Sequence, residues 1–330
     1  MPEETIDHAD SVVIGEGEYV WPNILSDISK GRLKTLYESK KAIDLRDSPT
    51  PRFDMLKPKK YSSISIQTSR GCPHDCEYCS SSKIFGSKYR WKTVQQVLDE
   101  VKLVKKHFCD TQIFFSDDNF LVNKKYSTAL LEKLQDLKIH WYAQSDIAIG
   151  ADSERLKLMK KSGCTNIFIG LESVSPDGLR HIDRHGWKFK QLKHYSEFVQ
   201  RIQYHGIGVI GAFMVGLDSD DPAIFEQIAE FVIKNHLMGA SITIQTPLPG
   251  TRLRERLEGE GRLLPTPWNN YTGYSANHIP KKISIKDLEN GLLHLYEKIY
   301  NEDVNLNKMK YLTELAIDRR KKRKLLQMQV

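Results

Sequence analysis

Short apolar runs alternate with amphipathic segments along residues 61–250 of this 330-residue chain. The apolar runs predict strands at 63–68, 112–115, 139–144, 166–169, 208–215 and 241–245. Helical spacing predicts helices near 94–108, 124–137, 153–161 and 190–205, and one capped by Asp221 that begins at Pro222. Thr93 and Gln96 form a capping box before the first of these helices. Repeated strand–helix units predict an α/β fold, a partial (β/α)6 TIM-like barrel with a parallel sheet.

The segments on either side of this region have other patterns. Residues 1–42 contain one predicted strand, at 11–14, and a short helix that ends near Lys30. Residues 43–60 are rich in Pro, Asp and Lys and predict an extended linker. Residues 251–330 predict a C-terminal helical extension with a basic tail, which we expect to cover the open edge of the barrel.

Polar residues stand directly after several predicted strands, where parallel α/β folds form their sites. They are Ser116, Asp117, Asp118 and Asn119 after the second strand, Ser145 and Asp146 after the third, Glu172 and Ser173 after the fourth, and Asp218 to Asp220 after the fifth. The sequence therefore predicts a ligand site at the carboxyl ends of the strands.

Composition narrows the class of protein. No apolar run reaches the roughly 18 residues of a membrane span, and the acidic N-terminus lacks the features of a signal peptide, so a cytoplasmic protein is predicted. Cys109 and Cys164 stand alone in the sequence, and we interpret each as a small core residue. Unpaired cysteines of this kind suit a reducing compartment.

The net charge of +7 comes almost entirely from six consecutive basic residues at 319–324. A solvated helix end is the preferred interpretation of this tail, and contact with nucleic acid or anionic lipid is the alternative. Basic and aromatic residues are not interleaved, so a nucleic-acid partner is not expected.

Three cysteines share one short segment after the first predicted strand: Cys72, Cys76 and Cys79, in a C-x3-C-x2-C pattern. Thiolates hold iron–sulfur clusters, and a cubane with three protein ligands keeps one iron open for chemistry. A zinc knuckle is an alternative that requires a fourth Cys or His at regular spacing, and His74 lies too close to its neighbours for that. A disulfide with a spare thiol is the other alternative.

This segment, with Tyr78 before the last cysteine, resembles the signature of the radical S-adenosylmethionine (radical SAM) enzymes. The resemblance implies that the three cysteines hold a [4Fe-4S] cluster, that the methionine moiety of S-adenosylmethionine chelates the open iron, and that Tyr78 lies near the adenine. It also implies reductive cleavage to a 5′-deoxyadenosyl radical, which abstracts a substrate hydrogen, and an electron donor such as flavodoxin or ferredoxin.

The same resemblance places Asp117, Asp118 and Asn119 at the motif that binds the methionine ammonium, where a carboxylate suits a cation. The sequence does not show which aspartate points inward. Ser145, after the third strand, is a further predicted cofactor contact. For each single carboxylate, a helix-capping role is the alternative.

Three more residues are assigned by resemblance. Glu172 and Ser173 match an element that reaches the ribose or amino group of S-adenosylmethionine. Arg184 matches a basic residue that pairs with the methionine carboxylate. We interpret Glu172 and Arg184 together as cofactor contacts.

Other segments resemble the cobalamin-dependent subclass of the family. Residues 1–42 resemble the last strand and helix of its cobalamin domain, and Pro247 to Thr251 resemble its closing segment. The Asp-x-His-x-x-Gly motif of many such domains is absent, since the nearest approach, Asp183 to His185, has Lys188 in place of the glycine. We therefore expect cobalamin to bind only with a separate cobalamin-domain protein, because one strand and helix cannot enclose a corrin.

Two alternative functions each require a further feature in the sequence. A non-catalytic iron–sulfur electron-transfer module would have a fourth cysteine near the loop, and a methylthiotransferase-like enzyme would have a further three-cysteine domain and an RNA-binding barrel. The sequence shows none of these. A small-molecule substrate of natural-product or lipid type is expected, with either hydrogen abstraction or radical methylation as the outcome.

Overall fold

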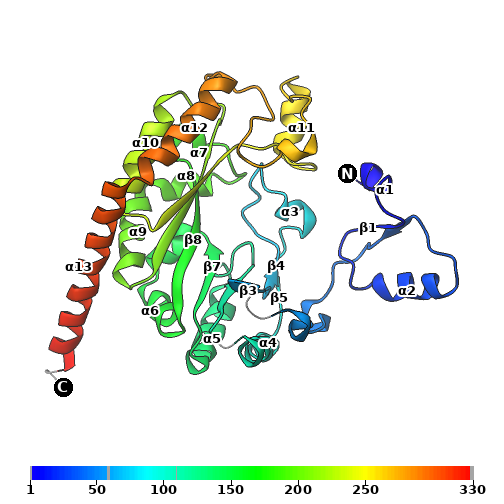
Figure 1. Cartoon of the computed structure of the whole chain (residues 1–330), viewed down its shortest axis with the longest axis horizontal. Helices are drawn as coiled ribbons and strands as arrows, with labels where there is room; N and C mark the ends of the chain where they lie inside the picture. Colours follow the sequence, from blue (N-terminus) through cyan, green and yellow to red (C-terminus); the bar gives the residue numbers. More distant parts are fainter. Residues whose placement is uncertain (1, 58–59, 109, 328–330) are drawn as a thin grey trace.

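The computed structural model describes residues 2–57, 60–108 and 110–327. Its centre is a six-stranded sheet in which all neighbouring strands are parallel, in the order β10-β9-β8-β7-β6-β3 (Figure 1). The strands are β3 (Ser63–Ile66), β6 (Gln112–Phe115), β7 (Trp141–Ser145), β8 (Cys164–Glu172), β9 (Gly208–Val215) and β10 (Gly239–Ile244). The predicted α/β partial barrel is confirmed, and β6 and β9 have the predicted bounds.

Helices connect successive strands along the outside of the sheet. They are α4 (Val94–His107), α5 (Lys124–Leu134), α6 (Ser153–Lys161), α7 (Pro176–Leu179), α8 (Trp187–Gln191), α9 (Tyr195–Tyr204) and α10 (Ala223–Lys234). The capping box of Thr93 and Gln96 forms at the start of α4. The helix predicted at 190–205 is instead divided into α8 and α9, because Lys188 and Tyr195 each make a separate buried contact with the end of β8.

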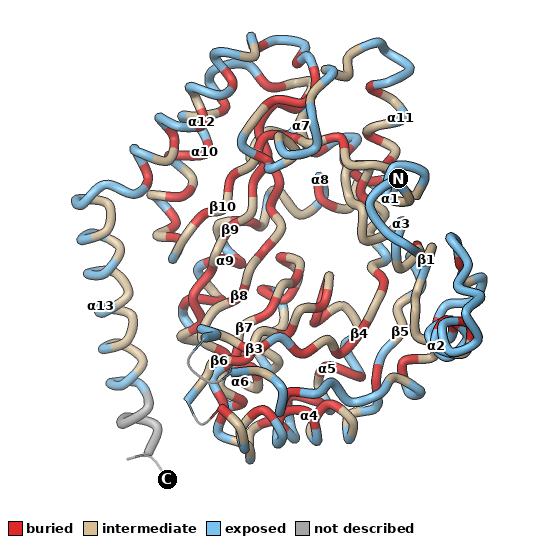
Figure 2. The backbone as a smooth tube through the Cα atoms, turned by 45° about the vertical axis from the view of Figure 1, so that its right-hand side comes forward, coloured by how far each residue is buried: buried red, intermediate tan, exposed pale blue. Residues whose placement is uncertain are grey.

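The core lies between the sheet and these helices, and Figure 2 shows its buried residues along the strands. Phe115 at the end of β6 stacks on Phe120 at 4.7 Å between ring centroids, and Trp141 meets both rings edge-on. The indole N–H of Trp141 donates to the carbonyl of Ser162 (3.0 Å), so its polar atom is satisfied inside the core. This packing fixes the strand ends from which the site residues project.

Helix α12 (Ile285–Ile299) covers the free edge of the sheet at β10, as expected for the helical extension. The hydroxyl of Tyr300 accepts a hydrogen bond from the backbone N–H of Ala240 and donates to its carbonyl, each at 2.9 Å. Tyr296, one turn earlier, makes the same pair of bonds with Ile242. Two tyrosines thus take the place of a seventh strand and protect an edge that would otherwise be open to pairing.

We predict that Tyr296→Phe combined with Tyr300→Phe lowers the free energy of unfolding by about 2–5 kcal/mol, because buried backbone groups lose their partners at about 1–3 kcal/mol each, offset in part by water at this edge. Urea denaturation followed by circular dichroism measures the change. Tyr61→Phe, at an exposed tyrosine, is the matched control. A double variant as stable as the control would show that water replaces both hydroxyl groups.

The N-terminal unit contains β1 (Val12–Ile14), α2 (Trp21–Ser29) and a second parallel strand, β2 (Leu36–Glu38), after a short α1 (Pro2–Ile6). The second strand was not predicted, because three residues are too few for a recognisable alternation. The buried carboxylate of Glu16 pairs with Arg70 and Arg90 and ties this unit to the barrel. The predicted boundaries at 42, 60 and 250 stay predictions.

Past α12, the chain continues as α13 (Glu302–Gln327), the long helix that runs down one side of the molecule in Figure 1. In the part of the chain that the structure describes, no helix is both long and apolar enough to cross a bilayer. Cys164 is buried as predicted, whereas Cys109 lies outside the described residues.

Candidate functional site

The cysteine loop lies at the carboxyl edge of the sheet. It follows β4 (Ser69–Arg70), which pairs with β5 (Arg90–Trp91), and leads into α3 (Ser81–Ile84). Gly71 opens the loop with φ +93°, a conformation that suits glycine. The backbone of Cys76 forms an isolated antiparallel β-bridge with that of Asp183, so the middle of the loop is fixed to the segment after α7.

A cavity of about 260 Å³ lies against this loop. Eight of the predicted site residues line it: Cys72, Cys76, Tyr78, Cys79, Asp118, Asn119, Ser145 and Glu172. The lining also includes Asp146, one of the polar residues predicted at the strand ends, and further residues that the sequence does not indicate as cofactor contacts: His74, Ser81, Gln144, Phe168, Gly170, Lys188 and Ala212. The structure thus brings the cysteine loop together with residues that follow three different strands.

The donor set suits an iron–sulfur cluster. Cys72, Cys76 and Cys79 are free thiols, and burial raises the pKa of Cys72 to about 11 and of Cys76 to about 12, so both stay protonated until a metal displaces the proton. Among the described residues, no three His, Cys, Asp or Glu side chains converge on one ion, as a zinc knuckle requires. A cubane instead spreads three cysteines over three different irons.

Glu172 ends β8 in an unusual conformation. Its φ is +68°, and the pairing with β9 shifts register between Gly170 and Glu172. The carboxylate accepts a hydrogen bond of 2.8 Å from the ammonium of Lys188, which also donates to the carbonyl of Gly170 at 3.0 Å. The two side chains are only 8% and 6% exposed. Strained backbone and buried ion pairs persist where the surroundings hold them, and both are common at functional sites.

The ion pair also changes the electrostatics around it. Burial alone would lower the pKa of Lys188, but Glu172, together with Cys76 and Tyr195, outweighs burial, so the pKa is raised and the ammonium stays charged. Burial and the charge of Glu172 raise the pKa of Tyr78. Asp183 accepts the backbone N–H of Lys188 (3.0 Å), so the residue that contacts Cys76 also anchors the start of α8.

A second polar network lies on the other side of the cavity. Asp146 accepts hydrogen bonds from the amide of Asn119 (2.7 Å) and lies 3.0 Å from Nε2 of His74. The hydroxyl of Ser145 donates to the side-chain oxygen of Asn119 (3.2 Å). The ring of His74 packs on Trp187 at 4.2 Å between centroids. His74 is therefore held by the wall of the cavity.

The neighbouring aspartates have different environments. Asp117 is fully buried and accepts hydrogen bonds from the backbone N–H (3.2 Å) and hydroxyl (2.9 Å) of Thr68 and from the hydroxyl of Ser69. Burial raises the pKa of Asp117 to about 6. Asp118 lines the cavity instead. The ends of β3 and β6 are thus joined by Asp117, and Asp118 faces the space where a ligand fits.

Besides Asp117, two predicted residues lie away from the cavity lining. Ser173 is buried, and its hydroxyl accepts the backbone N–H of Ser175 (3.1 Å), which supports the turn before α7. Arg184 has a side chain that is 59% exposed and pairs with Asp75 at 2.7 Å. Lys188, one turn further along, is the cation that lines the cavity.

Fold and site together define an α/β-barrel protein with a cluster-binding loop at the carboxyl edge of its sheet. A family model described as "Radical SAM superfamily" matches residues 66–232, and one described as a domain of unknown function, DUF4070, matches residues 251–329. The chain belongs to the radical SAM superfamily, whose cofactors are a [4Fe-4S] cluster and S-adenosylmethionine.

Its relatives include methyltransferases. The bacteriochlorophyllide d C-12(1)-methyltransferase of Chlorobaculum tepidum is 28% identical over 316 residues, which cover 94% of this chain and 68% of that protein. An uncharacterized methyltransferase of Pyrococcus horikoshii is 31% identical over 80% of this chain and 61% of its own length.

A solved structure shares the fold. That of the cobalamin-dependent S-adenosylmethionine radical enzyme OxsB, with aqua-cobalamin bound, matches 96% of this chain and 57% of that chain, with a TM-score of 0.63 at 17% identity. The resemblance to the cobalamin-dependent subclass is therefore confirmed in the fold. The chain spans between 57% and 68% of the lengths of these three proteins.

Proposed function

We propose that this protein binds S-adenosylmethionine in the 260 Å³ cavity and cleaves it reductively, with Cys72, Cys76 and Cys79 holding the [4Fe-4S] cluster. The observation that carries the proposal is the meeting of three free cysteines, a carboxylate and a buried cation in one cavity at the carboxyl edge of the sheet. When bound, the cluster supplies the electron that splits the sulfonium into methionine and a 5′-deoxyadenosyl radical.

The chain's own groups bind and orient the cofactor. Asp118 supplies a negative charge for the methionine ammonium, and Lys188 supplies a positive charge for the methionine carboxylate. Asn119 and Ser145 are held in place by the network around Asp146 and present polar groups to the same space. Tyr78 forms an apolar wall for the adenine. Fixed groups around the cavity position the sulfonium for cleavage.

Anaerobic reconstitution with iron and sulfide, followed by incubation with S-adenosylmethionine and dithionite, tests this function. Formation of 5′-deoxyadenosine reports reductive cleavage, and S-adenosylhomocysteine reports methyl transfer. A reconstituted protein that forms neither product would contradict the proposal. In this proposal a protein such as flavodoxin or ferredoxin donates the electron to the cluster, and the enzyme works in the cytoplasm.

We predict different effects of the two neighbouring aspartates. Asp118→Asn should weaken S-adenosylmethionine binding roughly tenfold to a hundredfold without loss of stability, because a contact with a charged group contributes about 1.5–3 kcal/mol. Asp117→Asn should mainly lower the melting temperature, because Asp117 bonds Thr68 and Ser69. Calorimetric titration and thermal melting measure the two effects. The reverse assignment of the two phenotypes would contradict this geometry.

We further propose that the reaction is a radical methylation in which a partner domain supplies the cobalamin. Two observations support this: the methyltransferase relatives, and the fold shared with a cobalamin-dependent S-adenosylmethionine radical enzyme. The N-terminal unit, with its two short strands, cannot by itself bury a corrin ring. The substrate, by the same analogy, is a small molecule of natural-product or lipid type.

Gel filtration tests the cobalamin proposal. We predict that the purified chain loses added hydroxocobalamin on the column, whereas the cluster's absorbance stays with the protein. Stoichiometric retention of cobalamin by the chain alone would contradict the prediction, and retention only after addition of a cobalamin-domain protein would support it.

A further inference from the structure

Helix α11 (Arg252–Gly259) begins on the cysteine loop. The backbone N–H of Leu253, in the first turn of the helix, donates to the carbonyl of Glu77 (3.0 Å), so the loop satisfies a donor that has no partner within the helix. The guanidinium of Arg252 donates to the carbonyl of Asp75 (2.5 Å). Leu253 is fully buried. The start of α11 is therefore fixed to the cysteine loop.

Glu77 is the point at which the loop meets both the barrel and α11. It lies between two of the predicted cluster ligands, Cys76 and Cys79. Its backbone N–H donates to the carbonyl of Ile182, in the segment after α7 (2.9 Å), and its carbonyl accepts the hydrogen bond from α11. Its carboxylate accepts hydrogen bonds from the guanidinium of Arg256 at 3.0 and 3.4 Å. The backbone and the side chain of Glu77 thus have partners outside the loop.

Arg256 also reaches the end of a central strand. Its guanidinium donates to the carboxylate of Asp218 (2.7 Å), which follows β9. A guanidinium can hold two carboxylates at fixed angles, because it is planar and carries several N–H donors. The side chains of Glu77 and Asp218 are 18% and 29% exposed, so both contacts are partly shielded from water. Arg256 therefore joins the cysteine loop to a strand that also lines the proposed cofactor cavity through Ala212.

The charges around Arg256 are balanced. Asp218 also pairs with Arg262 (2.8 Å) and Lys281 (3.2 Å), and Glu260 pairs with Arg256 (3.2 Å) and Arg262 (2.7 Å). Burial alone would raise the pKa of Asp218, but Arg262, Arg256 and Lys281 outweigh burial and lower the pKa to about 2. Among the described residues, three cations thus meet three carboxylates: Arg256, Arg262 and Lys281 with Glu77, Asp218 and Glu260. The network has no net charge, and what it contributes to the loop is fixed geometry.

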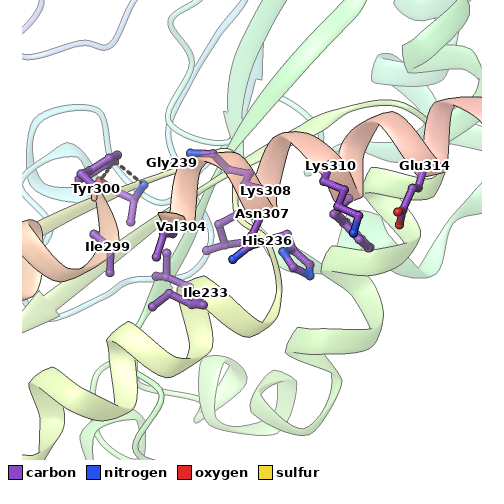
Figure 3. Close-up of a pocket in the computed structure, with 14 residues that line it drawn as sticks. Ile233, His236, Gly239, Ile299, Tyr300, Val304, Asn307, Lys308, Lys310 and Glu314 are labelled. Atoms are coloured by element: carbon purple, nitrogen blue, oxygen red, sulfur yellow. Dashed lines mark hydrogen bonds between the residues drawn. The ribbon is translucent and has the colours of Figure 1, made fainter. Parts of the chain in front are cut away.

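The helices that follow α11 are seated on the body of the molecule. Figure 3 shows a cavity of about 300 Å³ with walls from α13 and from the ends of α12 and α10. Tyr311 of α13 stacks on His236 at 4.1 Å between ring centroids, and Arg319 donates to the carbonyl of Gln203 (2.8 Å). The segment that the DUF4070 model matches, 251–329, is thus anchored through α12 and α13, and its first helix meets the cysteine loop.

The cysteine loop has a conformation that its surroundings must hold. Asp75 has φ +46°, a left-handed backbone that is uncommon for a residue other than glycine. Its carboxylate pairs with Arg184 at 2.7 Å, and its carbonyl accepts the hydrogen bond from Arg252. Without such partners, the segment between Cys72 and Cys76 would relax toward a more common backbone conformation and change the spacing of the thiols.

We propose that the segment 251–329 holds the cysteine loop in the conformation that receives the cluster, with Arg256 as a positioning residue that acts through Glu77. This inference rests on the proposed assignment of Cys72, Cys76 and Cys79 to the cluster. Thiols that are already held in place lose less conformational entropy when they bind iron. Groups that orient metal ligands typically contribute about tenfold to a hundredfold in metal affinity.

Hydrogen–deuterium exchange of the full chain without a cluster tests the link itself. Arg256→Met removes the guanidinium but keeps a long side chain, so peptides that contain Glu77 and Cys79 should exchange roughly tenfold to a hundredfold faster. Glu77→Gln should have a similar effect. The double variant should exchange no faster than the more affected single variant, because both changes remove the same contact.

Iron release from the reconstituted protein gives the second measurement. Arg256→Met should lose iron to a chelator about tenfold to a hundredfold faster than the native chain. Its reduced cluster should also give a broader electron paramagnetic resonance signal, because the cysteines occupy several positions. Arg254→Met is the matched control, since Arg254 lies on the same helix but contacts Pro247 and Tyr271. It should exchange and release iron as the native chain does.

Native exchange and native iron release in Arg256→Met overturn the positioning role, and Glu77→Gln decides in the same way if Arg256→Met does not fold. Equal effects of Arg254→Met and Arg256→Met also overturn it, since they would show only a loss of helix stability. A native chain that holds no cluster contradicts the proposed function. A native chain with its cluster, beside an unchanged Arg256→Met variant, contradicts the positioning role alone.

Discussion

Cys72→Ala, Cys76→Ala and Cys79→Ala are each expected to abolish the [4Fe-4S] absorbance and all 5′-deoxyadenosine formation. The three thiols line one cavity, and a cubane that loses one of three protein ligands has no replacement there, because the cavity lining contains no fourth cysteine. The iron content after anaerobic reconstitution, the absorbance near the cluster band and the product assay measure the loss.

Cys164→Ala is the control for this series. Cys164 is also buried and free, but it lies at the start of β8, at the opposite end of the strand from Glu172. This variant should keep the native iron content and form 5′-deoxyadenosine. A Cys76→Ala protein that still assembles the cluster and cleaves S-adenosylmethionine would contradict the assignment of the loop.

The strands and the cysteine loop were predictable because their signals are local. Apolar runs mark β6 and β9 with the observed bounds, and the spacing of three cysteines needs no tertiary information. The second strand of the N-terminal unit, β2, is not predicted, because three residues are too few to show an alternation of apolar and polar positions. The break between α8 and α9 was missed because it depends on contacts with β8, which lie 16 and 24 residues away in sequence.

The direction of single side chains was not predictable. Asp117 and Asp118 are adjacent, and which one faces the cavity is decided by Thr68, 49 residues earlier. Lys188 has no local pattern that distinguishes it from exposed lysines such as Lys190, and its burial follows from pairing with Glu172 across the turn. The sequence predicts Arg184 as the basic residue of the site, but in the structure Arg184 pairs with Asp75 outside the cavity lining.

The ion pair between Lys188 and Glu172 gives the second large effect. We expect Lys188→Met to lower the free energy of unfolding by about 3–5 kcal/mol, because it leaves a buried carboxylate without a partner. Lys188→Met combined with Glu172→Gln should recover most of that loss, since no unpaired charge remains. Urea denaturation of the two single variants and the double variant gives the coupling energy. Lys298→Met, which breaks an exposed pair with Glu226, should change stability by only about 0.2–1 kcal/mol.

Binding of S-adenosylmethionine separates a structural role from a role in the site. If the pair only stabilises the fold, the restored double variant binds the cofactor as the native protein does. If Lys188 contacts the methionine carboxylate, the double variant is stable and keeps its cluster, yet its affinity falls roughly tenfold or more below that of the Glu172→Gln single variant, because the charged contact of Lys188 is gone. We expect the second result in calorimetric titration, together with a lost change in the cluster's electron paramagnetic resonance spectrum on cofactor addition. Native affinity in the stable double variant would remove Lys188 from the proposed site.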